Sequence, residues 1–81
     1  EMHVEDQMIQ DQIHQDVRDL LECLPEEQRE VVHMRIEREL SFQEIADETG
    51  VSINTALGRM RYALINMRRT MEERGVQLTL N

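Results

Sequence analysis

Residues 41–71 contain two helix signals separated by a tight turn, and they constrain the fold more than any other part of the chain. Ser41 is followed three residues later by Glu44, the spacing of a capping box that begins a helix. Gly50 predicts the end of this helix, because glycine adopts the left-handed conformation that a sharp turn requires. Ser52 can cap a second helix that follows at once. A short helix, a tight turn and a second helix form the arrangement that lays a recognition helix in the major groove of DNA.

Charge is distributed unevenly along the chain, whose formal net charge is −8. Residues 1–50 carry four Arg and fifteen Asp or Glu, whereas residues 51–81 carry five Arg and two Glu. Residues 53–71 contain four Arg and no acid. A net acidic charge argues against DNA binding, but this distribution makes the predicted second helix positive. The chain has no Lys, and Arg suits bidentate contacts with phosphate or guanine better than Lys does.

Hydrophobic periodicity predicts an all-α fold of four helices, in which a three-helical DNA-binding core of the winged-helix kind, without a wing, follows an N-terminal helix. We expect the helices over residues 8–24, 26–39, 42–49 and 53–74. The last two form the helix-turn-helix, at about residues 42–73. The residues expected to be buried on the second and fourth helices are Val31, Val32, Met34 (in part), Ile36, Ile53, Ala56, Leu57, Met60, Ala63, Leu64, Met67 and Met71.

The rest of the chain predicts a small domain bounded by short ends. We expect residues 1–7 to be frayed, residues 8–74 to form the domain and residues 75–81 to be a tail. No apolar run approaches the roughly 18–20 residues that a membrane span needs. The single cysteine, Cys23, cannot form an internal disulfide and fits a cytoplasmic location, and its place near an apolar helix face predicts that it is buried and inert.

The side of the predicted recognition helix opposite its apolar stripe supplies the candidate DNA contacts. Its first two turns lie deepest in the groove, so the candidates for base edges are Asn54, Thr55, Gly58, Arg59 and Tyr62. Arg can bridge two guanine acceptors, Asn can pair with adenine, and a Thr methyl can touch a thymine methyl. Gly58 either permits close approach to DNA or is a tolerated surface glycine. The candidates for phosphate contacts are Ser41, Gln43, Ser52, Arg61, Arg68 and Arg69.

Catalysis finds little support in the sequence. There is no Gly-rich phosphate loop, no cysteine cluster and no Ser/His/Asp set with a recognisable order. His3, His14 and His33 are too far apart along the chain for helical spacing to join them into a metal site. We therefore expect neither an enzyme nor a cofactor, a metal or a small-molecule substrate.

Several segments resemble region 4 of bacterial RNA polymerase sigma factors, most of all those of the extracytoplasmic-function type. They are residues 24–31 (LPEEQREV), 40–46 (LSFQEIA), 50–52 (GVS), 54–55 (NT) and 59–60 (RM), within a resemblance that covers about residues 16–72. The resemblance implies recognition of the minus-35 element in double-stranded promoter DNA, docking on the β flap of the RNA polymerase core, and occlusion by an anti-sigma factor. It also implies that Thr55 and Arg59 lie on the DNA-facing side.

Two other interpretations remain open at this stage. The helix-turn-helix output domain of response regulators and quorum-sensing activators shares a similar Leu-Ser-x-x-Glu-Ile-Ala segment and a Gly-Val-Ser turn. The other interpretation does not involve DNA: the chain could be an acidic helical module that binds only protein, through its N-terminal helix. Sequence-specific DNA binding that is lost in Arg59→Ala would argue against the protein-binding module.

Overall fold

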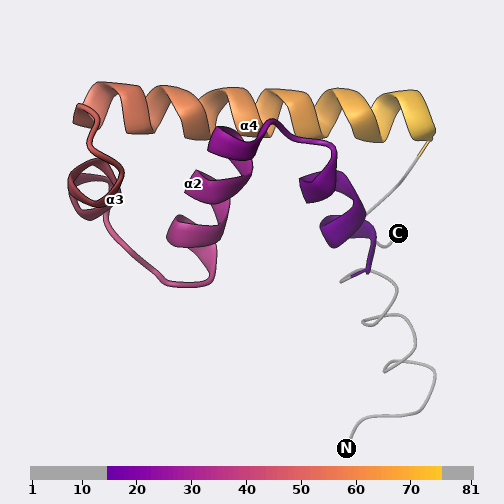
Figure 1. The fold of residues 1–81 in the computed structure, drawn as a ribbon. Helices are drawn as coiled ribbons and strands as arrows, with labels where there is room; N and C mark the ends of the chain where they lie inside the picture. The colour runs from indigo at the N-terminus through magenta and orange to yellow at the C-terminus, as the bar shows by residue number, and fades with distance from the viewer. Residues whose placement is uncertain (1–14, 76–81) are drawn as a thin grey trace, which may run out of the picture.

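A computed structural model describes residues 15–75 of the chain, and within them every regular element is a helix. A helical segment at 15–22 is followed by α2 (Glu26–Ile36), α3 (Phe42–Thr49) and α4 (Ile53–Arg74). In Figure 1 the three shorter helices lie along one side of α4, which passes over all of them. The expected all-α fold with a helix-turn-helix is thereby confirmed, while the expectations for residues 1–14 and 76–81 lie outside the described range.

Local capping explains where α3 and α4 begin and end. The Ser41 side chain accepts a hydrogen bond from the Glu44 amide (3.1 Å), and the Ser41 amide donates to Glu44 Oε1 (2.9 Å), which completes a capping box. Gly50 ends α3 with φ 71°, in the left-handed region. The Ser52 side chain then accepts from the Thr55 amide (3.1 Å) at the start of α4. The helix-turn-helix bounds expected from these residues are those of the structure.

The core consists of two small apolar clusters that share the half-buried side chain of Met60. Ala56 lies in the first cluster and Ala63 in the second, and neither side chain is exposed to solvent. The two alanines are seven residues apart, so they lie on the same side of α4. Their small side chains let the neighbouring helices approach α4 closely. The buried partners in the two clusters are Val31, Met34, Ile45 and Ala46, and Leu24 and Val32.

Four residues that the periodicity places in the core are exposed instead. The relative exposure is 63% for Ile36, 40% for Ile53, 42% for Leu57 and 55% for Leu64. On α4 the buried residues are Ala56 and Ala63, which form a narrow line, and the apolar residues at the margins of that line remain open to solvent. Ile36 is the last residue of α2, where that helix ends. Cys23, expected to be buried, is also exposed, and its Sγ accepts a hydrogen bond from Arg74 Nη2 (3.0 Å).

The second helix ends earlier than expected, at Ile36 and not near residue 39. Glu39 adopts φ 54°, in the left-handed region that non-glycine residues rarely enter, so the helix cannot continue through it. Two arginines hold this turn. Arg35 Nη1 donates to the Leu40 carbonyl (3.2 Å), and Arg38 donates to both carboxylate oxygens of Glu48 in α3 (2.6 and 3.0 Å).

Candidate nucleic-acid interface

The side of α4 turned away from the other helices is uncovered along its length (Figure 1). We call it the recognition face. Asn54, Thr55 and Tyr62 are exposed there, and Gly58 is half-buried. The described residues that form the recognition face are Asn54, Thr55, Gly58, Arg61, Tyr62, Ile65 and Arg69. Four of the five candidates for base contacts therefore lie on one continuous surface.

Arg59 lies at the edge of this face and not at its centre. Its side chain is only 22% exposed, and Nη2 lies 3.5 Å from Glu27 Oε2 in the first turn of α2. Sequence reasoning placed Arg59 on the DNA side but could not foresee this ion pair, because its partner belongs to a different helix. A base contact by Arg59 requires its guanidinium to leave the carboxylate or to share it.

The polar residues at the start of the helices are partly engaged within the chain. The Ser52 hydroxyl donates to Thr55 Oγ1 (3.0 Å) while it accepts from the Thr55 amide. Gln43 donates one amide hydrogen to Asp47 (2.9 Å), which leaves its second hydrogen for another acceptor. The hydroxyl hydrogen of Thr55 also remains available, because Thr55 Oγ1 acts as the acceptor in the contact with Ser52.

The phosphate candidates on α4 differ in their surroundings. Arg61, Arg68 and Arg69 are all exposed. Arg68 Nε lies 3.7 Å from Glu72 one turn further along, an exposed ion pair that contributes little. Within residues 15–75 no ion pair joins Arg61 or Arg69 to an acid. These two guanidinium groups are therefore the ones most available to an anion.

The carboxylates of α3 are held in place at both ends of the helix. The hydrogen bonds from the Ser41 backbone and side chain lower the pKa of Glu44 below its ordinary value of 4.5. The hydrogen bonds from Arg38 likewise lower the pKa of Glu48, and Glu48 in turn raises the pKa of Arg38. α3 is thus negatively charged and α4 positively charged. Glu44 and Glu48 of α3 are tied to these structural contacts, and no ion pair joins an acid of α3 to an arginine of α4 among the described residues.

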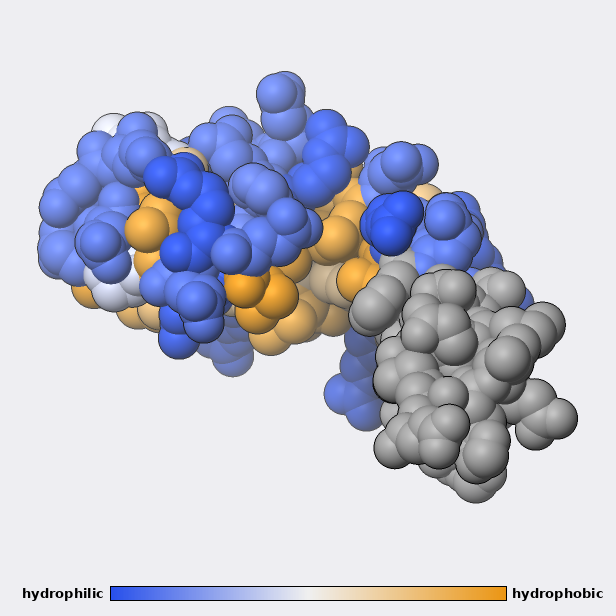
Figure 2. Space-filling view, turned by 90° about the horizontal axis from the view of Figure 1, so that it is seen from below, coloured by the Kyte–Doolittle hydropathy of each residue, from blue (hydrophilic) through white to orange (hydrophobic). Residues whose placement is uncertain are grey.

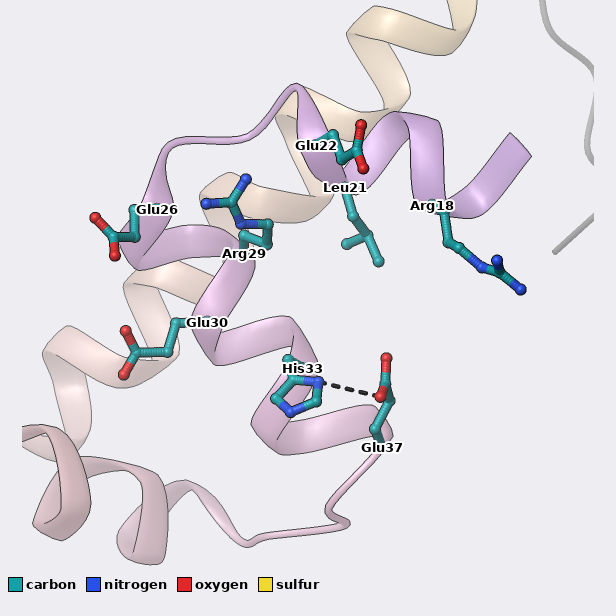
Figure 3. A pocket seen from close by; sticks show the side chains of 8 residues that line it. All are labelled: Arg18, Leu21, Glu22, Glu26, Arg29, Glu30, His33 and Glu37. Atoms are coloured by element: carbon teal, nitrogen blue, oxygen red, sulfur yellow. Dashed lines mark ion pairs between the residues drawn. The ribbon is translucent and has the colours of Figure 1, made fainter. Parts of the chain in front are cut away.

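Two grooves lie away from the recognition face, and sequence reasoning predicted neither of them. One, of about 420 Å³, lies between the helical segment at 15–22 and α2 and has a mixed-charge lining (Figure 3). Its lining residues are Arg18, Leu21, Glu22, Glu26, Arg29, Glu30, His33 and Glu37, with His33 Nδ1 3.1 Å from Glu37 Oε2.

The second groove, which we call the apolar groove, has a volume of about 210 Å³. Hydrophobic residues also reach the surface on the face of the molecule shown in Figure 2. The side chains of the apolar groove come from the N-terminal helical segment, α2 and α4. They are Val17, Leu21, Val32, His33, Ile36, Glu37, Met60, Leu64 and Met67.

Among residues 15–75, no group of three or more His, Cys, Asp or Glu side chains is arranged to hold a metal ion. None of the described helices combines the length and the apolar character needed to cross a membrane.

Comparison with known proteins gives one finding that bears on this interface. The family model for sigma-70, region 4, matches residues 14–64, more than half of the chain. A comparison with curated proteins finds no match. The matched region includes α2, α3 and α4 as far as Leu64, and with them Asn54, Thr55, Gly58, Arg59 and Tyr62. Sigma region 4 is a DNA-binding domain that serves promoter recognition with RNA polymerase, and it is not an enzyme family. The chain belongs to the sigma-70 region 4 family.

Proposed function

We propose that this domain recognises the minus-35 promoter element as part of an alternative sigma factor of the extracytoplasmic-function type, and thereby directs RNA polymerase to its promoters. The observation that carries the proposal is the recognition face. It is uncovered, it lies on the second helix of a helix-turn-helix, and residues 53–71 of that helix carry four Arg and no acid. Phosphate attraction and base-edge contacts need this combination of shape and charge.

In this proposal the first three turns of α4 read the bases. Asn54 and Thr55 are exposed in the first turn, where an amide can pair with adenine and a methyl group can contact thymine. Tyr62 lies two turns further along and is 60% exposed. Arg59 supplies the contact with the strongest preference, because its guanidinium can bridge the two acceptors of guanine.

The phosphate contacts in this proposal surround the base readers. Arg61, Arg68 and Arg69 attach the length of α4 to the DNA backbone. Ser41, Gln43 and Ser52 lie at the starts of α3 and α4, where hydroxyl and amide donors and the helix N-termini favour an anion. These contacts fix the position of α4 in the groove but carry no sequence information of their own.

We further propose that RNA polymerase docks at the apolar groove, through the β flap, and that an anti-sigma factor blocks one or both surfaces. The groove lies away from the recognition face, so a polymerase segment seated there leaves α4 free for DNA. Its lining is mainly apolar, with Leu64 and Ile36 exposed at 55% and 63%. Such exposed apolar surface is typical of a protein-binding site.

Selection of duplexes from a random pool tests the proposed function directly. The wild-type domain is expected to enrich a short motif, with affinity that falls steeply as salt increases. Arg59→Ala should lose about 1–3 kcal/mol on the selected duplex and relax the preference at one base pair. Arg69→Ala should weaken binding to selected and random duplexes alike and reduce the salt slope by about one.

Substitution of Arg69 tests the phosphate contacts better than substitution of Arg68, because no acid among the described residues pairs with Arg69. Equal losses on specific and random DNA for Arg59→Ala would contradict the base-reading role. If no motif is enriched even at low salt, the selection is repeated with RNA polymerase core present. Failure there too would reject minus-35 recognition and favour a module that binds only protein.

A further inference from the structure

Arg59 is held at the edge of the recognition face by contacts between α2 and α4. Its Nη2 lies 3.5 Å from Glu27 Oε2, and the Arg59 side chain is 22% exposed whereas that of Glu27 is 73% exposed. Asn66 lies seven residues after Arg59 on α4, and its Nδ2 donates to Gln28 Oε1 (2.8 Å) in a partly buried hydrogen bond between the same two helices. The facing positions of Glu27 and Arg59 are therefore set by helix packing.

The strength of this ion pair is limited by solvent. The two groups meet through a single contact of 3.5 Å, and the carboxylate is largely exposed. Exposed pairs of this kind contribute little to stability. A bidentate contact between Arg and guanine is stronger than such a pair and discriminates against the other bases. A guanine in the correct position can therefore draw Arg59 away from Glu27, while a weaker contact with an incorrect base cannot do so as easily.

We propose that Glu27 competes with DNA for Arg59 and so determines how strictly this residue discriminates between bases. The inference rests on the proposed function, because it assumes that Arg59 reads a base. Bound to a random duplex, Arg59 stays with the carboxylate of Glu27. Bound to the selected duplex, Arg59 exchanges that carboxylate for the base. Because the ion pair must be broken first, the affinity for the selected duplex is lower than it would be without Glu27.

Glu27→Gln tests the competition, with Glu26→Gln as the matched control. Both residues are exposed acids in the first turn of α2, so each substitution removes one negative charge from the same helix end. Of these two acids, Glu27 alone pairs with Arg59. We expect Glu27→Gln to bind the selected duplex about two- to fivefold more tightly than Glu26→Gln at the same salt concentration. On random duplexes the two variants should bind alike.

The same comparison in the Arg59→Ala background shows whether the effect passes through Arg59. There the difference between Glu27→Gln and Glu26→Gln should disappear. Circular dichroism establishes that each variant is folded before its affinity is measured. Equal affinities of the two single variants on the selected duplex overturn the inference. Weaker binding by Glu27→Gln also overturns it, because Glu27 then orients Arg59 instead of competing for it.

Failure of the proposed function has a different signature. If the wild-type domain selects no motif with or without polymerase, promoter recognition itself is wrong and the competition falls with it. If a motif is selected but Arg59→Ala keeps the full preference, the domain still reads DNA through other residues. In that case only the assignments to Arg59 and Glu27 are overturned.

Discussion

Gly58 lies in the middle of α4, and a Cβ atom placed on it would meet no heavy atom within 4 Å. Glycine in a helix interior costs about 1 kcal/mol relative to alanine, so this position weakens the helix without a packing reason. The recognition face includes Gly58, and in the proposed DNA complex its missing side chain would let the helix backbone approach the groove. The chain thus accepts a less stable helix at the place where we expect the closest approach to a base.

We predict that Gly58→Ala separates stability from DNA binding. The free energy of unfolding should rise by up to about 1 kcal/mol, measured by urea denaturation, because alanine is the stronger helix former. Affinity for the selected duplex should fall, because the added methyl group meets the floor of the groove. If stability rises and affinity is unchanged, Gly58 is a tolerated surface glycine and has no part in recognition.

At single positions, the sequence was informative where the cause is local and uninformative where it is not. The caps at Ser41 and Ser52 involve residues three positions away, and both are confirmed. The exposure of Leu57 and Leu64 depends on how much of α4 the neighbouring helices cover. Hydrophobic periodicity carries no information about that coverage. The pairing of Arg59 with Glu27 depends on how α2 crosses α4, so no local pattern indicates it.

At the scale of elements, α3 is the helix whose position depends most on hydrogen bonds to charged groups. The hydrogen bonds from Ser41 lower the pKa of Glu44 in the folded domain. A carboxyl group whose pKa is lower in the folded than in the unfolded state stabilises the fold above its unfolded pKa. That stabilisation is lost as the pH falls through the lower, folded value. The end of α3 nearest α2 is therefore sensitive to acid.

We predict that wild type loses thermal stability below about pH 4.5, and that Glu44→Gln loses less over the same range. Glutamine keeps the hydrogen bond of the capping box but does not titrate. The check is the melting temperature of both proteins from pH 7 to pH 3. Glu30→Gln, which removes an exposed carboxylate of α2 outside the capping box, is the control. Parallel curves for wild type and Glu44→Gln would contradict the prediction.

Between elements, the sequence predicted α3 and α4 but misplaced the end of α2. The start of α2 follows from Pro25, with Glu26 and Glu27 in its first turn. Its end depends on Glu39, a residue with no intrinsic preference for the left-handed conformation. The contact of Arg38 with Glu48 of α3 holds that turn, and it becomes visible only when the two helices are placed together.

At the scale of the whole molecule, α4 contributes residues to two different surfaces. Its outer side forms the recognition face, and its flank contributes Met60, Leu64 and Met67 to the apolar groove. Because the surfaces lie on different sides of one helix, the proposed DNA site and the proposed polymerase site do not overlap. Two of the four residues that periodicity assigned to the core and the structure exposes, Ile36 and Leu64, line this groove.

We predict that Leu64→Ser weakens binding to RNA polymerase core by several-fold while binding to the selected duplex is unchanged. Leu57→Ser is the matched control, because Leu57 lies seven residues earlier on the same side of α4, is 42% exposed and does not line the groove. Arg59→Ala should show the reverse pattern, with DNA preference lost and polymerase binding kept. The measurements are polymerase pull-down and duplex affinity for each variant.

Equal losses of polymerase binding in Leu64→Ser and Leu57→Ser would show that polymerase docks on the exposed flank of α4 and not in the groove. Loss of DNA binding in Leu64→Ser would show that the two surfaces are not independent.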